Sequence, residues 1–136
     1  MRSSSHFLLR TGLSITFLWI AVLIWRQPDA WGAIIQPWAA RLLPESIHLV
    51  MLESAVLDAI VGVLLLAGFW TWLAALLGAL HLSIVVLTIG FSDVTARDVG
   101  LLFAAVALFL ESPMPIPLAR IFLGKRGPPS ENNFFP

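Results

Sequence analysis

Two carboxylates lie inside an apolar region of the chain, in the stretch ESAVLDAIVG at residues 53–62. At the centre of a membrane helix an ionised carboxylate costs about 2.5–3.5 kcal/mol, so Asp58 is expected to have a partner or to carry a proton. The next ionisable side chain along the sequence is His81, and an imidazole can take up or release a proton near neutral pH. Asp58 and His81 are therefore the candidate catalytic residues, as a pair that handles a proton.

The positions of Asp58 and His81 along the chain predict that the two side chains meet. Each residue lies 11.5 positions from the middle of a predicted turn at residues 69–70. At about 1.5 Å per helical residue, both are about 17 Å from that turn and near the middle of a bilayer. Such a pair is either a carboxylate with an imidazolium or two neutral groups, and the sequence leaves both arrangements open.

Four further charged residues are predicted to form ion pairs that fasten helices together. Glu53 lies about 140° around a helix from Asp58, so it belongs to a different face. Its depth predicts a bond to Arg97, which lies at the head of the last apolar segment. Arg10 and Glu111 lie at comparable depths near the opposite face of the membrane and form the second predicted pair. Ion pairs of this kind more often fix helix packing than perform chemistry.

Other kinds of site are disfavoured by the residues that the chain lacks. It has no cysteine, which removes disulfides, thiolate metal sites and cysteine-based redox chemistry. A bis-imidazole haem needs two histidines within the membrane, but His6 lies near the start of the chain and His48 at an interface. No metal-ligand spacing, phosphate-binding glycine loop or nucleophile elbow occurs, so no metal site is predicted. Eight basic and eight acidic residues balance, so nucleic acid is not an expected partner.

The elements that hold these residues are predicted to be membrane helices, with the lipid bilayer as their surroundings. Of the 136 residues, 59% are hydrophobic and only 12% are charged, and the mean hydropathy is +0.91. The 34 residues at 59–92 carry no formal charge. At about 1.5 Å per residue this run reaches about 51 Å, which is too long for one crossing. Gly68 can end one helix and Thr71 can cap the next, so the region is divided into two spans.

The predicted fold class is all-α, an integral membrane four-helix bundle. A span needs about 20 mostly apolar residues. Four such segments occur, at residues 7–25, 47–69, 71–90 and 95–112. The first has a basic start like a signal peptide, but no small-residue cleavage pattern follows Trp25, so it is expected to be retained. The spans form one membrane domain, residues 1–119, and the polar, proline-rich segment 120–136 is predicted to be disordered.

The distribution of basic residues predicts the side on which the termini lie. Four spans place both termini on one side, which carries Arg2, Arg10, Arg120, Lys125 and Arg126. The other side carries Arg26, Arg41 and Arg97. Five basic residues against three favour cytoplasmic N and C termini, whereas a chain with three spans would weaken this asymmetry.

The connection between the first two spans is predicted to lie at the membrane interface. In residues 31–44, Ile34, Trp38 and Leu42 recur at a spacing of four, and Pro37 suits the first turn of a short helix. This segment is either an interfacial anchor or a lid over the bundle.

Three groups of residues resemble a known family. They are RTGL at residues 10–13, DAIVGVLLLAG at 58–68 followed by WTWLAALLGA, and ARDVGLL at 96–102. Through them the chain resembles the DoxX-like family of small four-helix bacterial and archaeal membrane proteins, over about residues 7–112. Asp58, Gly62 and Gly68 stand where members of that family usually carry a Glu and glycines of the second helix.

The resemblance implies a quinone-linked redox protein of a bacterial or archaeal inner membrane. Some members look like membrane subunits of thiosulfate:quinone oxidoreductase, so quinone is the implied cofactor. A soluble redox partner or a larger membrane complex is the implied partner. Proton exchange by Asp58 and His81 would suit quinone chemistry, because electrons and protons move together. Whether the chain is itself an enzyme is left open.

Two other functions are compatible with the sequence. A non-catalytic structural or assembly subunit would use the polar pairs only as fasteners. The small residues Ala74 and Gly78, and Gly100 and Ala104, are four apart, and they suit close packing within the bundle or a homodimer. A small proton-coupled transporter would suit a carboxylate at the midplane, although neither an inverted repeat nor a broken helix pair is evident.

Overall fold

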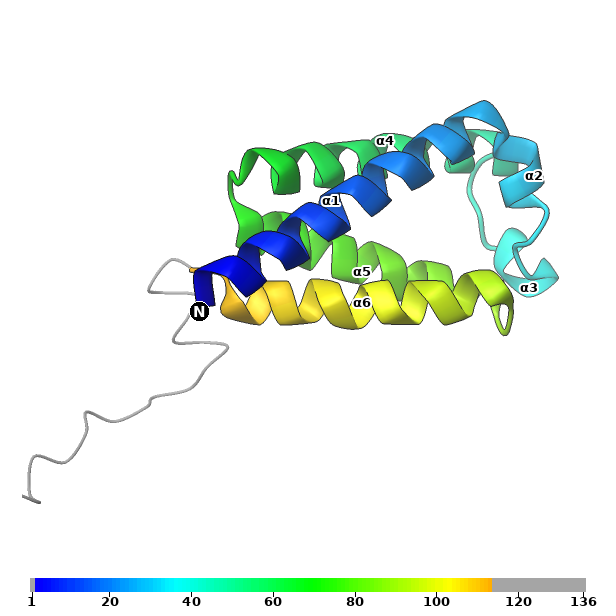
Figure 1. Ribbon diagram of the computed structural model, residues 1–136. Helices are drawn as coiled ribbons and strands as arrows, with labels where there is room; N and C mark the ends of the chain where they lie inside the picture. Colours follow the sequence, from blue (N-terminus) through cyan, green and yellow to red (C-terminus); the bar gives the residue numbers. More distant parts are fainter. Residues whose placement is uncertain (1, 114–136) are drawn as a thin grey trace, which may run out of the picture.

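The regular structure of this chain is helical, and the computed structural model describes residues 2–113 (Figure 1). Four long helices dominate: α1 (Arg2–Arg26), α4 (Ile47–Ala67), α5 (Thr71–Ile89) and α6 (Asp93–Glu111). Two short helices lie in the connection between α1 and α4: α2 (Pro28–Gly32) and α3 (Pro37–Ala40). No strand occurs in the described residues, so the predicted all-α class is confirmed. The predicted disordered tail, with three of the basic residues counted for orientation, lies outside them.

The helix ends follow from a few residues with special backbone geometry. Ser46 begins α4 by accepting a hydrogen bond from the Leu49 amide at 3.4 Å, and Gly68 ends it in the left-handed conformation at φ 76°. The prediction that Thr71 caps α5 is wrong, because Trp70 holds that position at φ 45° and Thr71 is the first helical residue. The Thr71 hydroxyl instead donates to the Gly68 carbonyl at 3.4 Å. Gly68 and Trp70 are both in the left-handed conformation, and together they reverse the chain between α4 and α5.

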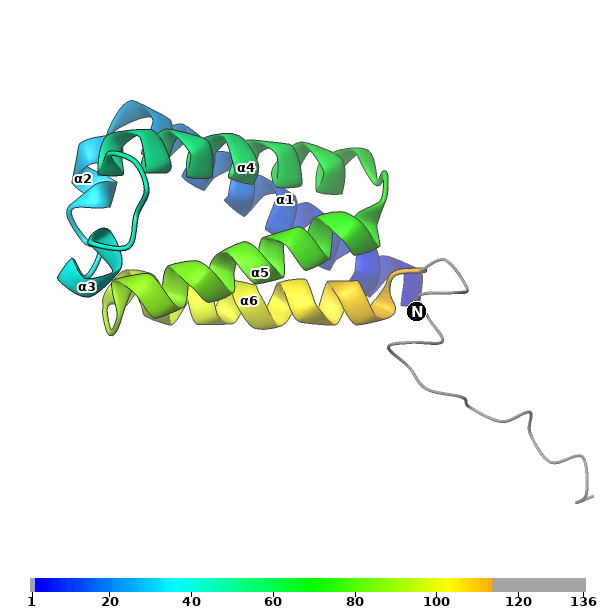
Figure 2. The same ribbon diagram turned by 180° about the vertical axis from the view of Figure 1, so that it is seen from behind.

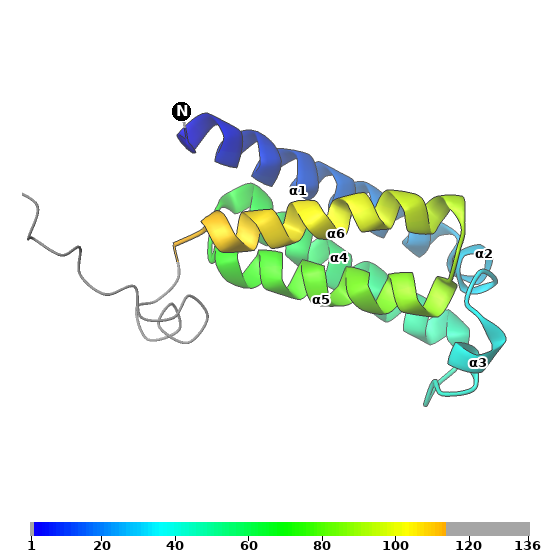
Figure 3. The ribbon, with the colours of Figure 1, turned by 90° about the horizontal axis from the view of Figure 1, so that it is seen from below.

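The four long helices form a bundle in which each helix has two neighbours. α1 packs mainly along α4 and α5 mainly along α6, while α4 also contacts α5 and α6 also contacts α1. α4 and α6 are therefore diagonal to each other. The start of α1, the α4–α5 turn and the end of α6 lie at one end of the bundle (Figures 1 and 2). We call the opposite end, which holds α2, α3 and the α5–α6 turn, the connection end (Figure 3).

Small side chains bring the helices together, and large apolar ones cover the outside. α5 buries Ala74, Ala75 and Ala79 in a core that also contains Phe17 of α1 and Leu65 of α4. Many large apolar side chains remain exposed on the outer faces of the long helices, among them Trp19, Leu87 and Phe103. Water would disfavour so much exposed apolar surface, whereas lipid accepts it.

Three of the described helices are long and apolar enough to cross a membrane. They are Ser4–Arg26, Ile47–Ala67 and Thr71–Ile89. α6 is as long as α5, but it carries Asp93, Arg97, Asp98 and Glu111. The three apolar helices indicate a membrane protein, and the charge on α6 distinguishes this helix from them.

The connection between α1 and α4 turns one of its faces into the bundle. Ile34, Trp38 and Leu42, the residues with the predicted spacing of four, are exposed. Pro37 is the first residue of α3. The residues one position later line the interior instead: Ile35, Ala39 and Leu43.

α1 and α4 approach each other closely at Gly62. The Ser14 hydroxyl donates to the Gly62 carbonyl at 2.7 Å within this buried contact. A Cβ atom at Gly62 would stand 2.7 Å from Cγ of Leu18 and 3.1 Å from its backbone nitrogen. The side chain of Leu18 can move, but its backbone cannot, so a larger residue at position 62 would push α1 away from α4.

Gly62→Ala is therefore expected to destabilise the bundle by about 1–3 kcal/mol relative to Gly100→Ala, because it overpacks a helix contact. Gly100→Ala is the matched control, since a Cβ atom at Gly100 meets nothing within 4 Å. Both changes gain about 1 kcal/mol of helix propensity, so their difference reports packing alone. The measurement is the unfolding midpoint in detergent, followed by tryptophan fluorescence. Equal midpoints for the two variants would contradict the close contact.

Candidate functional site

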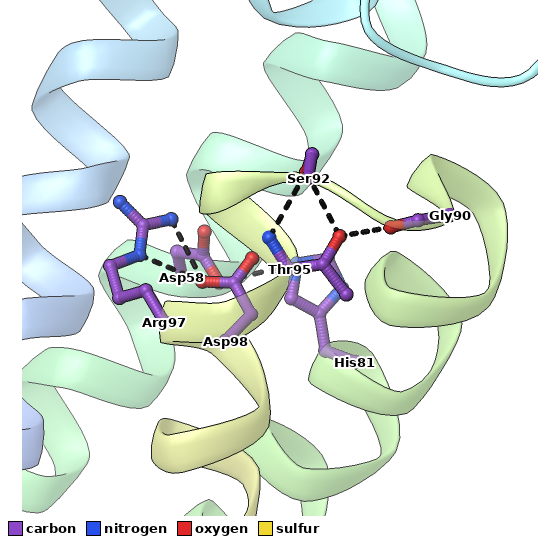
Figure 4. Close-up of polar contacts among 7 residues, drawn as sticks. All are labelled: Asp58, His81, Gly90, Ser92, Thr95, Arg97 and Asp98. Carbon is purple, nitrogen blue, oxygen red and sulfur yellow. Dashed lines mark hydrogen bonds and ion pairs between the residues drawn. The ribbon is translucent and has the colours of Figure 1, made fainter.

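Asp58 and His81 meet inside the bundle, each near the middle of its helix (Figure 4). Nε2 of His81 lies 3.3 Å from Oδ1 of Asp58, and the two side chains are 12% and 4% exposed. The distance suits an ion pair, but the contact does not meet the angles of a hydrogen bond, so Oδ1 of Asp58 has no hydrogen-bond partner among the described residues. Buried polar atoms in this state are rare and cost about 1–3 kcal/mol. Asp58 therefore has a buried acceptor atom that is free to bind a donor.

A second carboxylate, that of Asp98 on α6, is buried beside this pair and is 2% exposed. The preceding residue, Arg97, turns back onto it, with Nε and Nη2 at 2.9 and 2.8 Å from Oδ1 of Asp98. The Arg97 guanidinium also lies 5.8 Å from the ring centroid of Trp31 on α2. Figure 4 shows Arg97 and Asp98 of α6 beside Asp58 from α4 and His81 from α5. Three helices thus contribute to one polar cluster.

A cavity of about 170 Å³ lies among these residues. Its lining is mostly apolar and comes from all four long helices and from the connection between α1 and α4. The apolar and aromatic lining includes Phe17, Ile20, Ile24, Trp31, Ile35, Ala39, Leu43, Val50, Met51, Leu82, Val85 and Ile89. The polar lining consists of Ser54, Asp58, His81, Thr88, Arg97 and Asp98. An apolar hollow with a few convergent polar groups is the usual form of a site for a small molecule.

The connection between α1 and α4 closes the cavity at the connection end. The backbone N–H of Gln36 donates to the Thr88 carbonyl at 2.9 Å, and the side-chain NH₂ of Gln36 donates to the Ile89 carbonyl at 2.9 Å. These bonds satisfy carbonyls that the last turn of α5 leaves free. Asp29 of α2 pairs with His48 of α4, with Oδ1 and Nδ1 2.8 Å apart. The connection is therefore fastened both to α5 and to α4.

The first turn of α6 sets the positions of Arg97 and Asp98. Ser92 accepts a hydrogen bond from the Thr95 amide at 3.2 Å, and the two hydroxyls are 3.0 Å apart. The Thr95 hydroxyl also donates to the Gly90 carbonyl, which ties the α5–α6 turn to the helix (Figure 4). Asp98 follows Thr95 by three residues on the same inner face of α6.

The cluster can share one exchangeable proton. Arg97 remains charged and balances the carboxylate of Asp98. With one proton between them, Asp58 and His81 form a neutral pair, either as carboxylate and imidazolium or as carboxylic acid and imidazole. The two arrangements hold the same number of protons and differ only by a transfer across 3.3 Å. The pair can therefore give a proton to a ligand in the cavity or take one from it.

The other two histidines lie away from the cavity, at opposite ends of the bundle. Nε2 of His6 is 3.3 Å from the Ser112 hydroxyl at the end where α1 begins. His48 pairs with Asp29 at the connection end. Within residues 2–113, no group of three or more His, Cys, Asp or Glu side chains could hold a metal ion.

The structure does not bring Glu53 and Arg97 together. Glu53 is exposed on the outside of α4, whereas Arg97 pairs with its neighbour Asp98. Because α4 and α6 are diagonal, a side chain on the outer face of α4 points away from α6. The prediction compares only the depths of Glu53 and Arg97 in the membrane. Depth contains no information on which helices are neighbours.

Arg10 and Glu111 line the same hollow at the end of the bundle opposite the connection end, but no ion pair within the described residues joins them. The Arg10 guanidinium lies 5.8 Å from the ring centroid of Phe7. It also fills the space beside Gly68 in which a Cβ atom would stand. Arg10 therefore packs α1 against the α4–α5 turn, and its guanidinium is held there rather than at α6.

Asp98 is the member of the cluster that the sequence analysis misses. Asp98 lies within the predicted span 95–112, but only Arg97 and Glu111 of that span are given a role there. The spacing of the apolar residues of α6 could have predicted that Asp98 is buried. Thr95, Asp98, Ala105 and Leu108 share the buried face of this helix. Helical periodicity continued back from Leu108 places Asp98 on the inner face.

No family model matches the chain, and no curated protein or solved structure has significant similarity to it. Its function therefore has to be inferred from the geometry of its own residues.

Arg97→Gln is expected to lower the free energy of unfolding by about 2–3 kcal/mol, because it leaves the buried Asp98 carboxylate unpaired. The loss is smaller than for a fully buried pair because the Arg97 side chain is 40% exposed. Asp98→Asn should cost less, since the remaining guanidinium reaches solvent, and the double variant should resemble Asp98→Asn. Denaturant unfolding in detergent measures these differences. The control is Arg26→Gln, at an exposed arginine, and equal stability of the two arginine variants would contradict a structural role for the pair.

Proposed function

We propose that this chain is an integral membrane protein of quinone-linked redox metabolism, a redox accessory or subunit whose bundle holds a quinone-type ring beside Asp58 and His81. One observation carries the proposal: the carboxyl of Asp58 is buried, lacks a hydrogen-bond partner among the described residues, and lines an apolar cavity. The resemblance of residues 58–68 to the second helix of DoxX-like proteins supports the same interpretation.

The size and lining of the cavity suit a single aromatic ring. An engineered apolar cavity of about 150 Å³ in another protein binds benzene. The cavity here has about 170 Å³, and the aromatic residues Phe17 and Trp31 are part of its lining. Oxygen atoms on such a ring would find their polar partners among Asp58, His81 and Arg97.

A quinone would supply the redox chemistry, because its reduction to a quinol takes up two electrons and two protons. The electrons would come from a partner protein with a flavin, haem or iron–sulfur centre, either soluble or part of a larger membrane complex. This chain supplies a place for a proton, which Asp58 and His81 exchange across 3.3 Å. Arg97 balances the charge of Asp98, and the connection between α1 and α4 covers the cavity.

We propose further that α6 is a fourth span and that both termini face the cytoplasm of a bacterial or archaeal cell. The exposed face of α6 is apolar and includes Phe103, Val106 and Leu110. Its charged residues are confined to the first six positions and the last one, and Asp98 is turned into the bundle. The excess of basic residues on the side of the termini supports the orientation.

The absence of native cysteine allows a direct test of this topology with single introduced cysteines. In intact spheroplasts, a membrane-impermeant maleimide should label Glu45→Cys. Ser5→Cys and Pro113→Cys should react only after the membrane is permeabilised. Labelling of Pro113→Cys from outside, with Ser5→Cys still protected, would mean that α6 does not cross.

Binding of a small quinone should quench the fluorescence of the purified protein, because Trp31 lines the cavity. Trp31→Phe should lose most of the ligand-dependent quenching. Ser54→Leu should weaken binding at least tenfold, since it fills the cavity with side-chain atoms. The matched control is Ser83→Leu, at a residue of α5 that does not line the cavity. Absence of quenching, or equal binding by the two leucine variants, would contradict the proposal.

A structural or assembly subunit is the second candidate function, and the Arg97–Asp98 pair favours it. Arg97 and Asp98 pair with each other, and the guanidinium also lies over the ring of Trp31, so neither charge needs a ligand to balance it. On this alternative, Asp58→Asn would change the stability of the bundle, while the activity per assembled partner complex would stay the same.

A further inference from the structure

We propose that the cavity selects a ring that carries a hydroxyl group, such as a phenol or a hydroquinone, over an acceptor-only ring such as benzoquinone. The inference rests on the proposed function, because it concerns the same cavity, and it names the form of the ring that the cavity prefers. The preference depends on which polar atoms around the cavity already have hydrogen-bond partners and which do not.

Some of the hydrogen-bond donors of the lining are already committed. Two of the three guanidinium nitrogens of Arg97 point at Oδ1 of Asp98, at 2.9 and 2.8 Å. The Thr88 hydroxyl donates to its own helix, at 2.9 Å to the Ile84 carbonyl and 3.2 Å to that of Val85. Nη1 of Arg97, the Ser54 hydroxyl and a ring N–H of His81 are left, and the Ser54 hydroxyl can serve either as donor or as acceptor.

The acceptor of the lining that lacks a donor among residues 2–113 is the carboxyl of Asp58. Asp58 makes no hydrogen bond with the described residues, although His81 lies 3.3 Å from its Oδ1. If the proton of the pair lies on His81, both carboxyl oxygens of Asp58 accept. If the proton lies on Asp58, the carbonyl oxygen of the acid still accepts. In both arrangements a ligand that donates a hydrogen bond gains a partner at Asp58.

An acceptor-only ring would gain less from the same site. A carbonyl oxygen placed at Asp58 would face a second acceptor whenever Asp58 is a carboxylate, and it would find a donor there only when Asp58 holds the proton. A ring hydroxyl can accept from the same donors of Arg97, Ser54 and His81, and it can also donate to Asp58 in both arrangements. A site built to accept from a ligand hydroxyl discriminates strongly against an analogue that lacks it, because its polar atom is then left unpaired. The volume of about 170 Å³ limits the ligand portion inside the cavity to one lightly substituted ring.

The test compares four rings of similar size: hydroquinone, phenol, toluene and 1,4-benzoquinone. The chain contains no cysteine, so the quinone has no thiol to modify. The readout is the ¹⁹F NMR signal of the fluorotryptophan-labelled protein, with the resonance of Trp31 assigned by Trp31→Phe. Every ring that enters the cavity should shift this resonance. Each probe partitions into detergent equally for all variants, so ratios of affinity between variants are free of that effect.

Asp58→Leu removes the acceptor while it keeps a side chain of similar shape. Hydroquinone and phenol should bind this variant at least tenfold more weakly than the wild type, and toluene should bind it equally well or more tightly. Asp58→Asn offers an NH₂ donor, so it should shift the preference toward benzoquinone by about tenfold. The control is Glu53→Leu, at an exposed residue of the same helix outside the cavity, which should leave all four affinities unchanged.

The outcomes separate this inference from the proposed function. If benzoquinone binds the wild type more tightly than hydroquinone, or if Asp58→Leu leaves the phenol affinity unchanged, the hydroxyl preference is overturned and ring binding in the cavity stands. If none of the four rings shifts the Trp31 resonance, both the preference and the proposed function fall. A circular dichroism melt of each variant shows that it is folded. Should Asp58→Leu not fold, Asp58→Asn tests the same preference through the ratio of hydroquinone to benzoquinone affinity.

Discussion

The cost of burying charge in hydrocarbon is the constraint on which the rest of this structure depends. Asp58 lies in the middle of α4, where neither end of the helix offers it water. Asp98 lies on the inner face of α6, and Arg97 comes back to it from the edge of the bundle. The two carboxylates belong to diagonal helices, so the common interior is the place where both avoid lipid. His81 reaches that interior from α5, which packs against both helices.

The cavity is a consequence of the same cluster. In the half of the bundle near the α4–α5 turn, alanines of α5 let the helices pack around Phe17 and Leu65. Toward the connection end, carboxylates and a guanidinium replace aliphatic side chains, and their geometry is set by their partners rather than by shape. Space of about 170 Å³ is left between them. The connection between α1 and α4 covers this space because Gln36 bonds to carbonyls at the end of α5, where the helix has no partners of its own for them.

The buried polar groups and the cavity therefore lie together. The polar groups avoid lipid inside the bundle, and the cavity lies among them. Asp58 is the point where the two features meet, since its carboxyl belongs to the ion pair with His81 and also lines the cavity. The capping network of Ser92, Thr95 and Gly90 orients the first turns of α6 and so holds the remaining charges beside this point.

The sequence by itself determined the helical class, the approximate helix boundaries and the meeting of Asp58 with His81. Those features depend on local spacing and on distance from a turn, which can be counted along the chain. Only the tertiary structure decided which helices are neighbours. Glu53 and Arg97 share a depth but belong to diagonal helices, so depth alone could not exclude their pairing. Asp98 joins the site, and Ile35, Ala39 and Leu43 rather than Ile34, Trp38 and Leu42 face the cavity, because rotation of each segment about its axis is set by packing against its neighbours.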